Sequence, residues 1–438
     1  MTKEIFVASG RGYLSNRMIR ELIRSRQREL VELAASFIRI PSENPSPQFK
    51  KRSAEMGHHI SRYLAAKGFS ITEHRRSENA LVTVVCDAPL TKVSGPRLLF
   101  CGHTDVVPAG NRSRWTFDPF SGEVRAGMLL GRGASDMKGG LASLVFVAGL
   151  LQEFAPSLNL KGSLGVIASP DEENGGMEVA SLLAQGLIKG DACLIGEPTH
   201  PRHPNVGEKT MAFMRVTIPG LPGHGSTHPI TGTSAIRKGA IAVDALAKLL
   251  EFKATPPADL GQLLYNTEWF LYEQGDPSLS QLLYRPSYNP GIIQGGKKVN
   301  VIADECIIEV DSRVPFGMKP EFVLDVARSL VGTVAPGAVV EPMVPFVNPN
   351  WTLQNRPIVQ ATELGIKRVL GMEKPIFSIL LLGSSDASHF RSHGIDTVLY
   401  GPGMQHTVHG YDERVSVKSL VESAEIYAET AINYLGSS

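Results

Sequence analysis

Apolar positions in the first half of the chain alternate between helical and strand-like spacing. The helical segments are 15–40, 53–67, a stretch that begins after Gly140, and 178–185, and the strand-like runs are Leu81–Cys86, Arg97–Gly102, Leu164–Ala168 and Ala192–Gly196. Strands that are separated by helices usually form one parallel sheet with helices on both of its faces. The pattern therefore predicts an α/β domain with a mixed, largely parallel sheet between helices.

The middle of the chain has a different pattern, with more strand-like runs and fewer helices. The strand-like runs are Met211–Ile218, Lys298–Ala303, Cys306–Val314 and Ala338–Phe346, and the helical segments are 234–252 and 320–331. Two helices and a small antiparallel sheet indicate a separate α+β domain. Residues 255–290 contain prolines and tyrosines without a regular period, so we expect an irregular excursion there.

The first pattern resumes after about Asn348. The later elements are a helix at 357–370, strand-like runs at Ile376–Leu382 and Asp396–Tyr400, and a closing helix at 417–435. We therefore expect one domain built from 1–207 and 348–438, with residues 208–347 forming a second domain inserted into it.

Composition and charge narrow the class of protein. The 438 residues exceed the size at which one hydrophobic core stops growing, which agrees with two domains. Basic and acidic residues nearly balance, 44 against 43, so nothing favours a nucleic-acid partner, and the basic run Arg17–Leu30 is interpreted as a solvated helix face. Four scattered cysteines lie mostly in apolar runs and are expected to be buried thiols.

Signals for membranes and export are weak in the sequence. No apolar run reaches the ~18 residues that a bilayer span needs, and Leu141–Leu151 is too short. The N-terminal residues lack the basic-then-apolar layout of a signal peptide. We therefore expect a cytoplasmic protein without a membrane partner.

Polar residues that can bind metals or move protons follow the predicted strands. His103 and Asp105 come directly after Arg97–Gly102, and their side chains share one face of an extended segment. A lone histidine there would more often be structural, but the carboxyl ends of parallel strands are where α/β sheets place their sites. Structure and function therefore explain this pair about equally well.

Asp136 lies in the glycine-rich stretch GRGASDMKGG. This stretch is not a dinucleotide-binding fingerprint, because G-x-G-x-x-G is absent. Asp136 precedes a helix and could serve only as its N-cap. The glycines would also allow the backbone to bend and bring the carboxylate of Asp136 inward.

Acidic residues and histidines recur after the later strands. Glu172 and Glu173 lie in PDEENGG, Glu197 lies in IGEP, and His406 and His409 lie in QHTVHGYDERV. Several carboxylates at one edge of a sheet repel each other, and a bound divalent cation removes that repulsion. Two histidines with three or more carboxylates suit zinc, cobalt or manganese. One carboxylate shared by two ions ~3.5–4 Å apart would explain the large number of acidic groups.

Taken together, these motifs resemble a known family. GHTDVVP, GRGASDMKGG, PDEENGG, GEP and HGYDE are similar, in order and rough spacing, to those of the dinuclear zinc amidohydrolases. That family includes aminoacylase, acetylornithine deacetylase, succinyl-diaminopimelate desuccinylase and the glutamate-releasing carboxypeptidases. The resemblance runs from Phe37 to the last helix. Five ordered motifs are a specific signal, although each alone would be weak.

The resemblance implies a ligand set for two divalent ions, with zinc the first choice and cobalt or manganese the alternatives. His103 and Glu197 would complete one metal site, and Glu173 and His409 the other, with Asp136 bridging both. His409 is preferred over the nearby His406, because it stands at the family's spacing from the Asp-Glu pair that follows it.

The resemblance also implies roles around the metals. Glu172 would be the general base beside the attacking water, and Asp105 would orient His103. In the family the peptide bond after the bridging aspartate is cis, which here would be Asp136–Met137.

The inserted domain would act as a lid and dimerisation module, and it carries further candidates. His224 in PGLPGHGS would reach across the dimer to the substrate carbonyl, and its Gly-His-Gly context favours it over His228. Asn300 and Arg313 would bind substrate, since an arginine can hold a carboxylate with two hydrogen bonds. The loop that contains Gly383 and Ser384 would hold the substrate carboxylate.

The expected activity is hydrolysis of the amide bond in a small N-acyl amino acid by a homodimer. A metallo-exopeptidase that cleaves dipeptides or releases a C-terminal amino acid would need the same groups, and the sequence does not separate the two. The excursion at 255–290 is longer than we expect for the desuccinylase branch. A non-catalytic binding protein would not need both the ligands and the base, and a serine hydrolase lacks its G-x-S-x-G motif here.

Overall fold

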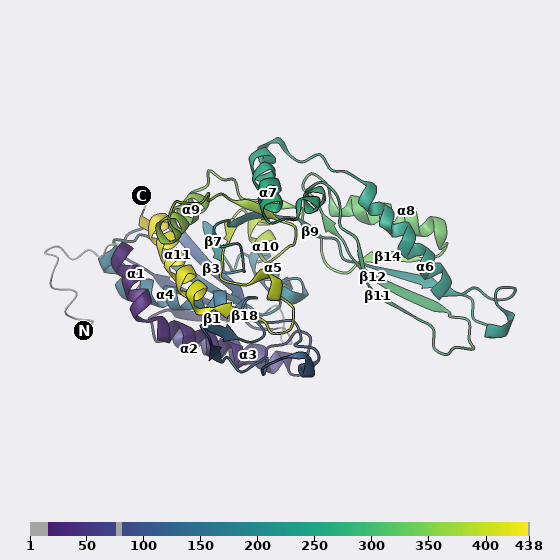
Figure 1. The fold of residues 1–438 in the computed structure, drawn as a ribbon, viewed down its shortest axis with the longest axis horizontal. Helices are drawn as coiled ribbons and strands as arrows, with labels where there is room; N and C mark the ends of the chain where they lie inside the picture. Colours follow the sequence, from purple (N-terminus) through teal and green to yellow (C-terminus); the bar gives the residue numbers. More distant parts are fainter. Residues whose placement is uncertain (1–15, 76–80, 437–438) are drawn as a thin grey trace. The chain divides into compact units, whose positions relative to one another are not determined.

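The chain forms two compact units in the computed structural model, which describes residues 16–75 and 81–436 (Figure 1). The first unit comprises the residues up to 206 together with 352–378 and 385–438, and the second comprises 207–351 and 379–384. These limits lie within four residues of the expected ones. They differ in grouping the short segment 379–384 with the second unit. Residue 15, where we expected the first helix to begin, lies outside the described residues.

The first unit is built on a mixed sheet. Its strands follow the order β1 (Ser70–His74), β2 (Thr83–Pro89), β6 (Ser163–Ser169), β3 (Arg97–His103), β7 (Ala192–Ile195) and β17 (Asp396–Leu399), and the sheet then continues into β8 (Asn205–Glu208). The central strands β6, β3, β7 and β17 are parallel, whereas β1 and β2 are antiparallel. The predicted mixed, largely parallel sheet is therefore confirmed.

Helices cover both faces of this sheet, which explains why its central strands β6, β3, β7 and β17 are almost continuously apolar. The helices are α1 (Asn16–Ser25), α2 (Gln27–Ile38), α3 (Phe49–Ala65), α4 (Lys138–Leu158), α5 (Met177–Ala184), α9 (Pro357–Leu370), α10 (Ala387–Ser392) and α11 (Val417–Gly436). Figure 1 shows α9 and α11 on one side of β3 and β7, and α5 and α10 on the other. Six of the seven residues of β3 are buried, as a strand covered on both faces requires.

Helix α4 is the longest helix of the first unit among the described residues, and it is strongly apolar. By length and composition alone it could cross a membrane, and it extends beyond the run Leu141–Leu151 that we judged too short. Most of its residues are buried, however, and it packs against β3, α2 and α11. It is therefore the core helix of this unit.

A small sheet of three short strands lies beside the main one and positions part of the candidate site. Its order is β18 (Arg414–Ser416), β5 (Met128–Leu130) and β4 (Val124–Arg125), all antiparallel. It joins the loop before α4 to the loop before α11, although these loops are far apart in the sequence.

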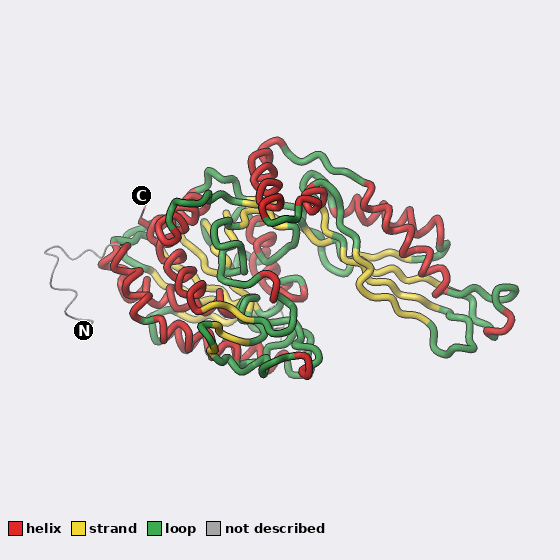
Figure 2. Tube along the Cα trace, viewed as in Figure 1, coloured by secondary structure: helices red, strands yellow, loops and turns green. Residues whose placement is uncertain are grey.

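The second unit contains a four-stranded antiparallel sheet with helices on one face (Figure 2). The strand order is β11 (Asn289–Gly295), β12 (Glu305–Asp311), β10 (Met214–Pro219) and β14 (Val339–Pro342). The helices are α6 (Ala235–Leu246), α7 (Gly261–Glu273) and α8 (Pro320–Val334), and the short strands are β9 (Thr210–Met211), β13 (Arg313–Val314), β15 (Asn350–Trp351) and β16 (Ile379–Leu381). Residues of α6 and α8 share a buried apolar cluster with the sheet.

One strand prediction was wrong. Residues Lys298–Ala303 do not form a strand but belong to the turn that joins β11 to β12, where Val301 makes an isolated bridge with His224. The true edge strand is β11, which begins inside the stretch that we expected to be irregular, and that stretch also contains α7. Most residues of β11 are exposed, so the apolar alternation that marks a strand is missing.

Candidate active site

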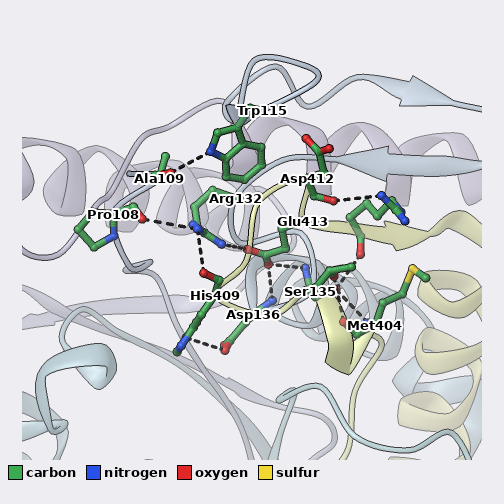
Figure 3. A network of polar contacts seen from close by, with 12 residues as sticks. Pro108, Ala109, Trp115, Arg132, Ser135, Asp136, Met404, His409, Asp412 and Glu413 are labelled. Carbon is green, nitrogen blue, oxygen red and sulfur yellow. Dashed lines mark hydrogen bonds and ion pairs between the residues drawn. The ribbon is translucent and has the colours of Figure 1, made fainter. Parts of the chain in front are cut away.

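The five predicted metal ligands come from five separate segments of the first unit. His103 is the last residue of β3, Asp136 lies just before α4, Glu173 lies in a short turn after β6, Glu197 follows β7, and His409 precedes β18. The strands of this sheet end at one edge, and the loops beyond that edge bring the five side chains together. Figure 3 shows His409 and Asp136 facing each other.

Asp136 lies between the two histidines and gives one carboxylate oxygen to each. Oδ1 is 3.0 Å from Nε2 of His103, and Oδ2 is 3.2 Å from Nε2 of His409. This is the placement that the bridging role requires. The peptide bond between Asp136 and Met137 is cis, as the resemblance implied.

The other predicted ligands complete the two sides of this arrangement. Oε1 of Glu197 lies 3.5 Å from His103 Nε2, and Oε2 of Glu173 lies 3.3 Å from His409 Nε2. Among the described residues, ligand atoms also gather in a second grouping, in which Glu172 joins His103 and Glu197 within 4.8 Å. Proximity alone therefore does not separate the predicted base from the predicted ligands.

Negative charge exceeds positive charge in this cluster, and the pKa values reflect it. Burial raises the pKa of Glu172 and of Glu197 well above the ordinary value, and like-charged neighbours add to the shift. Hydrogen bonds to Asp136 and Glu173 raise the pKa of His409 to about 10. Burial opposes protonation of His103, but neighbouring carboxylates, Glu197 first among them, raise its pKa.

The residues present fit divalent cations. Histidine nitrogens and carboxylate oxygens are suitable ligands for zinc, cobalt or manganese. One oxygen of Glu173 is buried without a hydrogen-bond partner in the part of the chain that the structure describes, which is costly unless a cation lies nearby. A cation on each side of Asp136 would neutralise the excess of carboxylates.

Asp105 contacts His103, the loop of the two glutamates and Asn44. Nδ1 of His103 lies 2.9 Å from the backbone carbonyl oxygen of Asp105 and 3.5 Å from its carboxylate. The same carboxylate accepts the backbone N–H groups of Glu172 at 3.2 Å and Glu173 at 3.3 Å. It also accepts a hydrogen bond from the side chain of Asn44 at 2.8 Å, a contact that sequence reasoning missed. Asp105 therefore ties His103 to the loop that carries both glutamates.

Three glycines allow these loops to approach one another. Gly175 and Gly176, directly after the glutamates, have φ angles of 100° and 64°, in the region that side chains disfavour. At Gly140, an added Cβ would lie 1.9 Å from the carbonyl oxygen of Gly196. The start of α4 can therefore pack closely against the loop that carries Glu197.

The second histidine of the late motif lies elsewhere. His406 is exposed and belongs to the turn Gln405–Thr407, whereas His409 contacts Asp136 and Glu173. The geometry thus favours the choice made from spacing.

The candidates in the second unit lie at opposite ends of its sheet. His224 and Asn300 are close together, because the N–H of Gly225 donates to the carbonyl of Asn300 at 2.9 Å. Arg313 follows the far end of β12, whose seven residues span roughly 20 Å at ~3.3 Å each. Its guanidinium is paired with the carboxylate of Asp311 at 2.8 and 3.1 Å. One copy of the second unit therefore does not bring these three side chains together.

Gly383 and Ser384 also belong to the second unit. The hydroxyl of Ser384 is buried and has no hydrogen-bond partner among the described residues. It remains a candidate for binding a substrate carboxylate.

Two further buried residues beside the candidate ligands were given no role from the sequence. Arg132 and Glu413 form a buried ion pair behind Asp136 and His409 (Figure 3). Glu413 had served only to fix the spacing of the late histidine. Both residues lie inside motifs that we singled out, and no property of the sequence distinguished them from their neighbours.

Comparison with known proteins supplies independent findings. The sequence model of the peptidase family M20/M25/M40 matches residues 99–433. The succinyl-diaminopimelate desuccinylase of Gluconacetobacter diazotrophicus is 30% identical over 404 residues, which cover 90% of this chain and 94% of that protein.

Solved structures show the same fold at low sequence identity. The M20 family metallo-carboxypeptidase Sso-CP2 from Sulfolobus solfataricus has a TM-score of 0.76 at 17% identity, covering 93% of this chain and 99% of that one. The di-peptidase Dug1p from Saccharomyces cerevisiae has a TM-score of 0.78 at 17% identity, covering 96% and 99%.

Proposed function

The chain belongs to the peptidase family M20/M25/M40, and on that premise we propose that it hydrolyses the amide bond of a small N-acyl amino acid. N-succinyl-diaminopimelate is the first substrate to test, since the relative with 30% identity is a desuccinylase. The observation that carries the proposal is the carboxylate of Asp136 between His103 and His409, with a further glutamate beside each histidine.

The first unit would hold two divalent cations, which we propose to be zinc, with cobalt or manganese as alternatives. Glu197 and His103 would bind one ion, Glu173 and His409 the other, and Asp136 both. When bound, such ions lower the pKa of a coordinated water and polarise the carbonyl group of the substrate.

Glu172 would move the proton. Its carboxylate takes a proton from the attacking water and then delivers that proton to the amide nitrogen that leaves. The products are a carboxylic acid and an amine, so one water is consumed for each bond. Burial raises the pKa of Glu172, which makes its carboxylate a stronger base toward the water than an exposed glutamate would be. Asp105 holds the backbone of Glu172 in place.

Arg313 and the partner subunit's His224 would bind the substrate in a homodimer. Within one copy, His224 and Asn300 lie at the opposite end of the sheet from Arg313, so a second copy could supply the missing pair. The edge strand β11 exposes Ile292 and Ile293, with 45% and 52% of their surface accessible. An exposed apolar edge strand is a surface that pairs readily with another chain.

Mixing two inactive variants tests this sharing of residues. In a mixed dimer of Glu172→Gln and His224→Ala, one composite site carries both changes and the other carries neither. After subunit exchange at equal amounts, activity should recover to about a quarter of the wild-type value, because half of the dimers are mixed and half of their sites are intact. Mixed dimers without any recovery would show that His224 acts within its own copy.

A substrate panel tests the reaction itself. N-succinyl-diaminopimelate and other N-succinyl and N-acetyl amino acids should release free amine, measured by amine labelling and mass spectrometry. Dipeptides test the exopeptidase alternative. The carboxypeptidase and the dipeptidase described above share the fold of this chain, but at their low sequence identity they support the fold alone. If dipeptides are cleaved and acylated amino acids are not, the deacylase proposal is wrong.

We place the protein in the cytoplasm, which agrees with its four buried, unpaired cysteines.

A further inference from the structure

A buried ion pair lies directly behind the candidate metal ligands (Figure 3). Arg132 follows β5 and is 2% exposed, and Glu413 precedes β18 and is fully buried. Nη1 of Arg132 lies 2.5 Å from Oε2 of Glu413. Two opposite charges are thus removed from water at a point where the small sheet joins two distant loops.

Glu413 holds the backbone from which the carboxylate of Asp136 projects. Its Oε1 atom accepts the N–H groups of Ser135 and Asp136, each at 3.0 Å. The carbonyl oxygen of Glu413 accepts the N–H of Gly131 at 2.9 Å, and the hydroxyl of Ser135 donates to the carbonyl of Arg414 at 2.8 Å. The loop before α4 is therefore fastened to the strand that follows His409.

Arg132 holds the other ligand loop. Its Nη2 atom points to the carbonyl oxygens of His409, at 3.4 Å, and Pro108, at 3.5 Å. The guanidinium also lies over the ring of Trp115, 5.2 Å from its centroid, and Trp115 donates to the carbonyl of Ala109 at 2.8 Å. The guanidinium is thus held by three groups besides Glu413.

Stability alone is a poor explanation for this pair. Burying two charges costs several kcal/mol for each, and replacing a buried pair by apolar residues is often neutral or stabilising. Here Nε of Arg132 is also buried without a hydrogen-bond partner among the described residues. The pair is better explained by the two backbones that it joins.

We propose that Arg132 and Glu413 are positioning residues that set the distance between the Asp136 carboxylate and the His409 imidazole. That distance, 3.2 Å between Oδ2 and Nε2, fixes the cation position that Asp136, His409 and Glu173 would share. The proposal rests on the proposed function, because it concerns the same cations. It adds that the ion pair of Arg132 and Glu413, which binds no cation itself, affects the cation position beside His409 more than the one beside His103.

Isothermal titration with zinc or cobalt tests the proposal on full-length protein first freed of metal by a chelator. Glu413→Gln keeps the size of the side chain and an oxygen for the two N–H groups, but it removes the charge that holds Arg132. Changes behind metal ligands typically weaken metal binding 10–100-fold, and we expect that loss in one of the two binding events. The affinity of the other binding event should change by no more than about threefold, which is well below the 10–100-fold loss expected for the first.

Further variants separate positioning from folding. Arg132→Lys keeps the charge and should lose less affinity than Arg132→Met. The double variant Arg132→Met/Glu413→Gln should be little worse than either single change, because both remove the same link. With metal supplied in excess, the kcat of these variants should fall while their KM stays within about twofold of the wild type. The reason is that the changes move the loop that carries His409 and leave the substrate contacts in place. Glu123→Gln is the matched control, since its exposed pair with Arg125 lies nearby and outside the site.

The outcomes are distinguishable. If Glu413→Gln and Arg132→Lys lower the thermal midpoint of the metal-free protein but leave both binding events unchanged, the pair is only structural and the proposal is overturned. Equal weakening of both events would also overturn it. A wild-type protein that binds no divalent cation would overturn the proposed function, and this proposal with it.

Discussion

The two main sheets of this protein differ in strand direction, and only the sheet of the first unit brings the candidate metal ligands together. The central sheet of the first unit is parallel at its core and covered by helices on both faces, so its central strands β6, β3, β7 and β17 are buried almost throughout. The antiparallel sheet of the second unit is covered on one face, and β10 alternates buried with partly or fully exposed residues. In the first sheet the central strands end at one edge, where five loops meet.

This difference shows why the candidate ligands lie together in one unit and apart in the other. Parallel strands all point their carboxyl ends the same way, so residues far apart in sequence converge. Antiparallel strands send successive loops to alternate ends, and Asn300 and Arg313 are separated by the length of β12 for that reason. One copy of the second unit therefore does not bring Asn300 and Arg313 together.

The largest expected effect concerns the proposed proton carrier of the first unit. Glu172→Gln keeps the size and burial of the side chain but cannot accept a proton from water, so kcat should fall about 10²–10⁴-fold. The metal content of this variant, measured by plasma emission spectrometry, should equal that of the wild type. Glu173→Gln, in contrast, should lower the metal content, because it changes a proposed ligand. Activity within about tenfold of the wild type would refute the assigned role of Glu172.

The next prediction tests whether damage to the second unit stays there. Ile308 is fully buried in β12, and Ile308→Ala should lower the free energy of unfolding by about 2–5 kcal/mol. Its matched counterpart is Ile167→Ala, at an equally buried position of β6. Urea denaturation would measure both losses. We expect weaker cation binding from Ile167→Ala alone, and equal weakening would contradict the division between the two units.

Sequence reasoning succeeded where the pattern depends on burial and failed where it depends on an edge. β3 and β7 were predicted nearly to the residue, because a strand covered on both faces must be apolar throughout. β11 was missed, because an edge strand with exposed residues carries no such mark. The same distinction applies to the site, since His103 and Asp136 follow recognisable strands and motifs.

Other parts of the site had no local signal in the sequence. The contact of Asn44 with Asp105 and the pair of Arg132 with Glu413 depend on loops that only the folded chain brings together. Their residue types are ordinary for exposed loops. Only the tertiary arrangement shows that they are buried next to the candidate metal ligands.

A pH dependence of cation binding would sharpen the electrostatic side of the comparison. His409 must lose its proton to bind a metal, and in the metal-free protein its pKa is raised to about 10 by Asp136 and Glu173. Cation affinity should therefore rise with pH between about 6.5 and about 10, by up to tenfold per unit for one proton released. Titration calorimetry in buffers of different ionisation enthalpy would count the protons, and zero release at pH 8 would contradict this expectation.

The smallest expected effect is on the free energy of unfolding, and it contrasts an exposed ion pair of the second unit with the buried pair of Arg132 and Glu413. Arg215 and Glu309 face each other across β10 and β12 with 50% and 24% of their side chains exposed. Exposed pairs contribute about 0.2–1 kcal/mol, so Arg215→Ala should lower the free energy of unfolding by no more than that. Thermal denaturation would measure it. A loss comparable to that of Arg132→Met would show that the exposed sheet depends on its ion pairs as much as the buried loops do.

The order of the ligands along the chain has a consequence for biosynthesis. His103, Asp136, Glu173 and Glu197 all leave the ribosome before the second unit, whereas His409 leaves after it. A nascent chain therefore lacks one side of the Asp136 arrangement until synthesis is nearly complete. Truncated products that end before His409 would lack one of the five candidate ligands, and on the proposed function they should bind one cation less tightly.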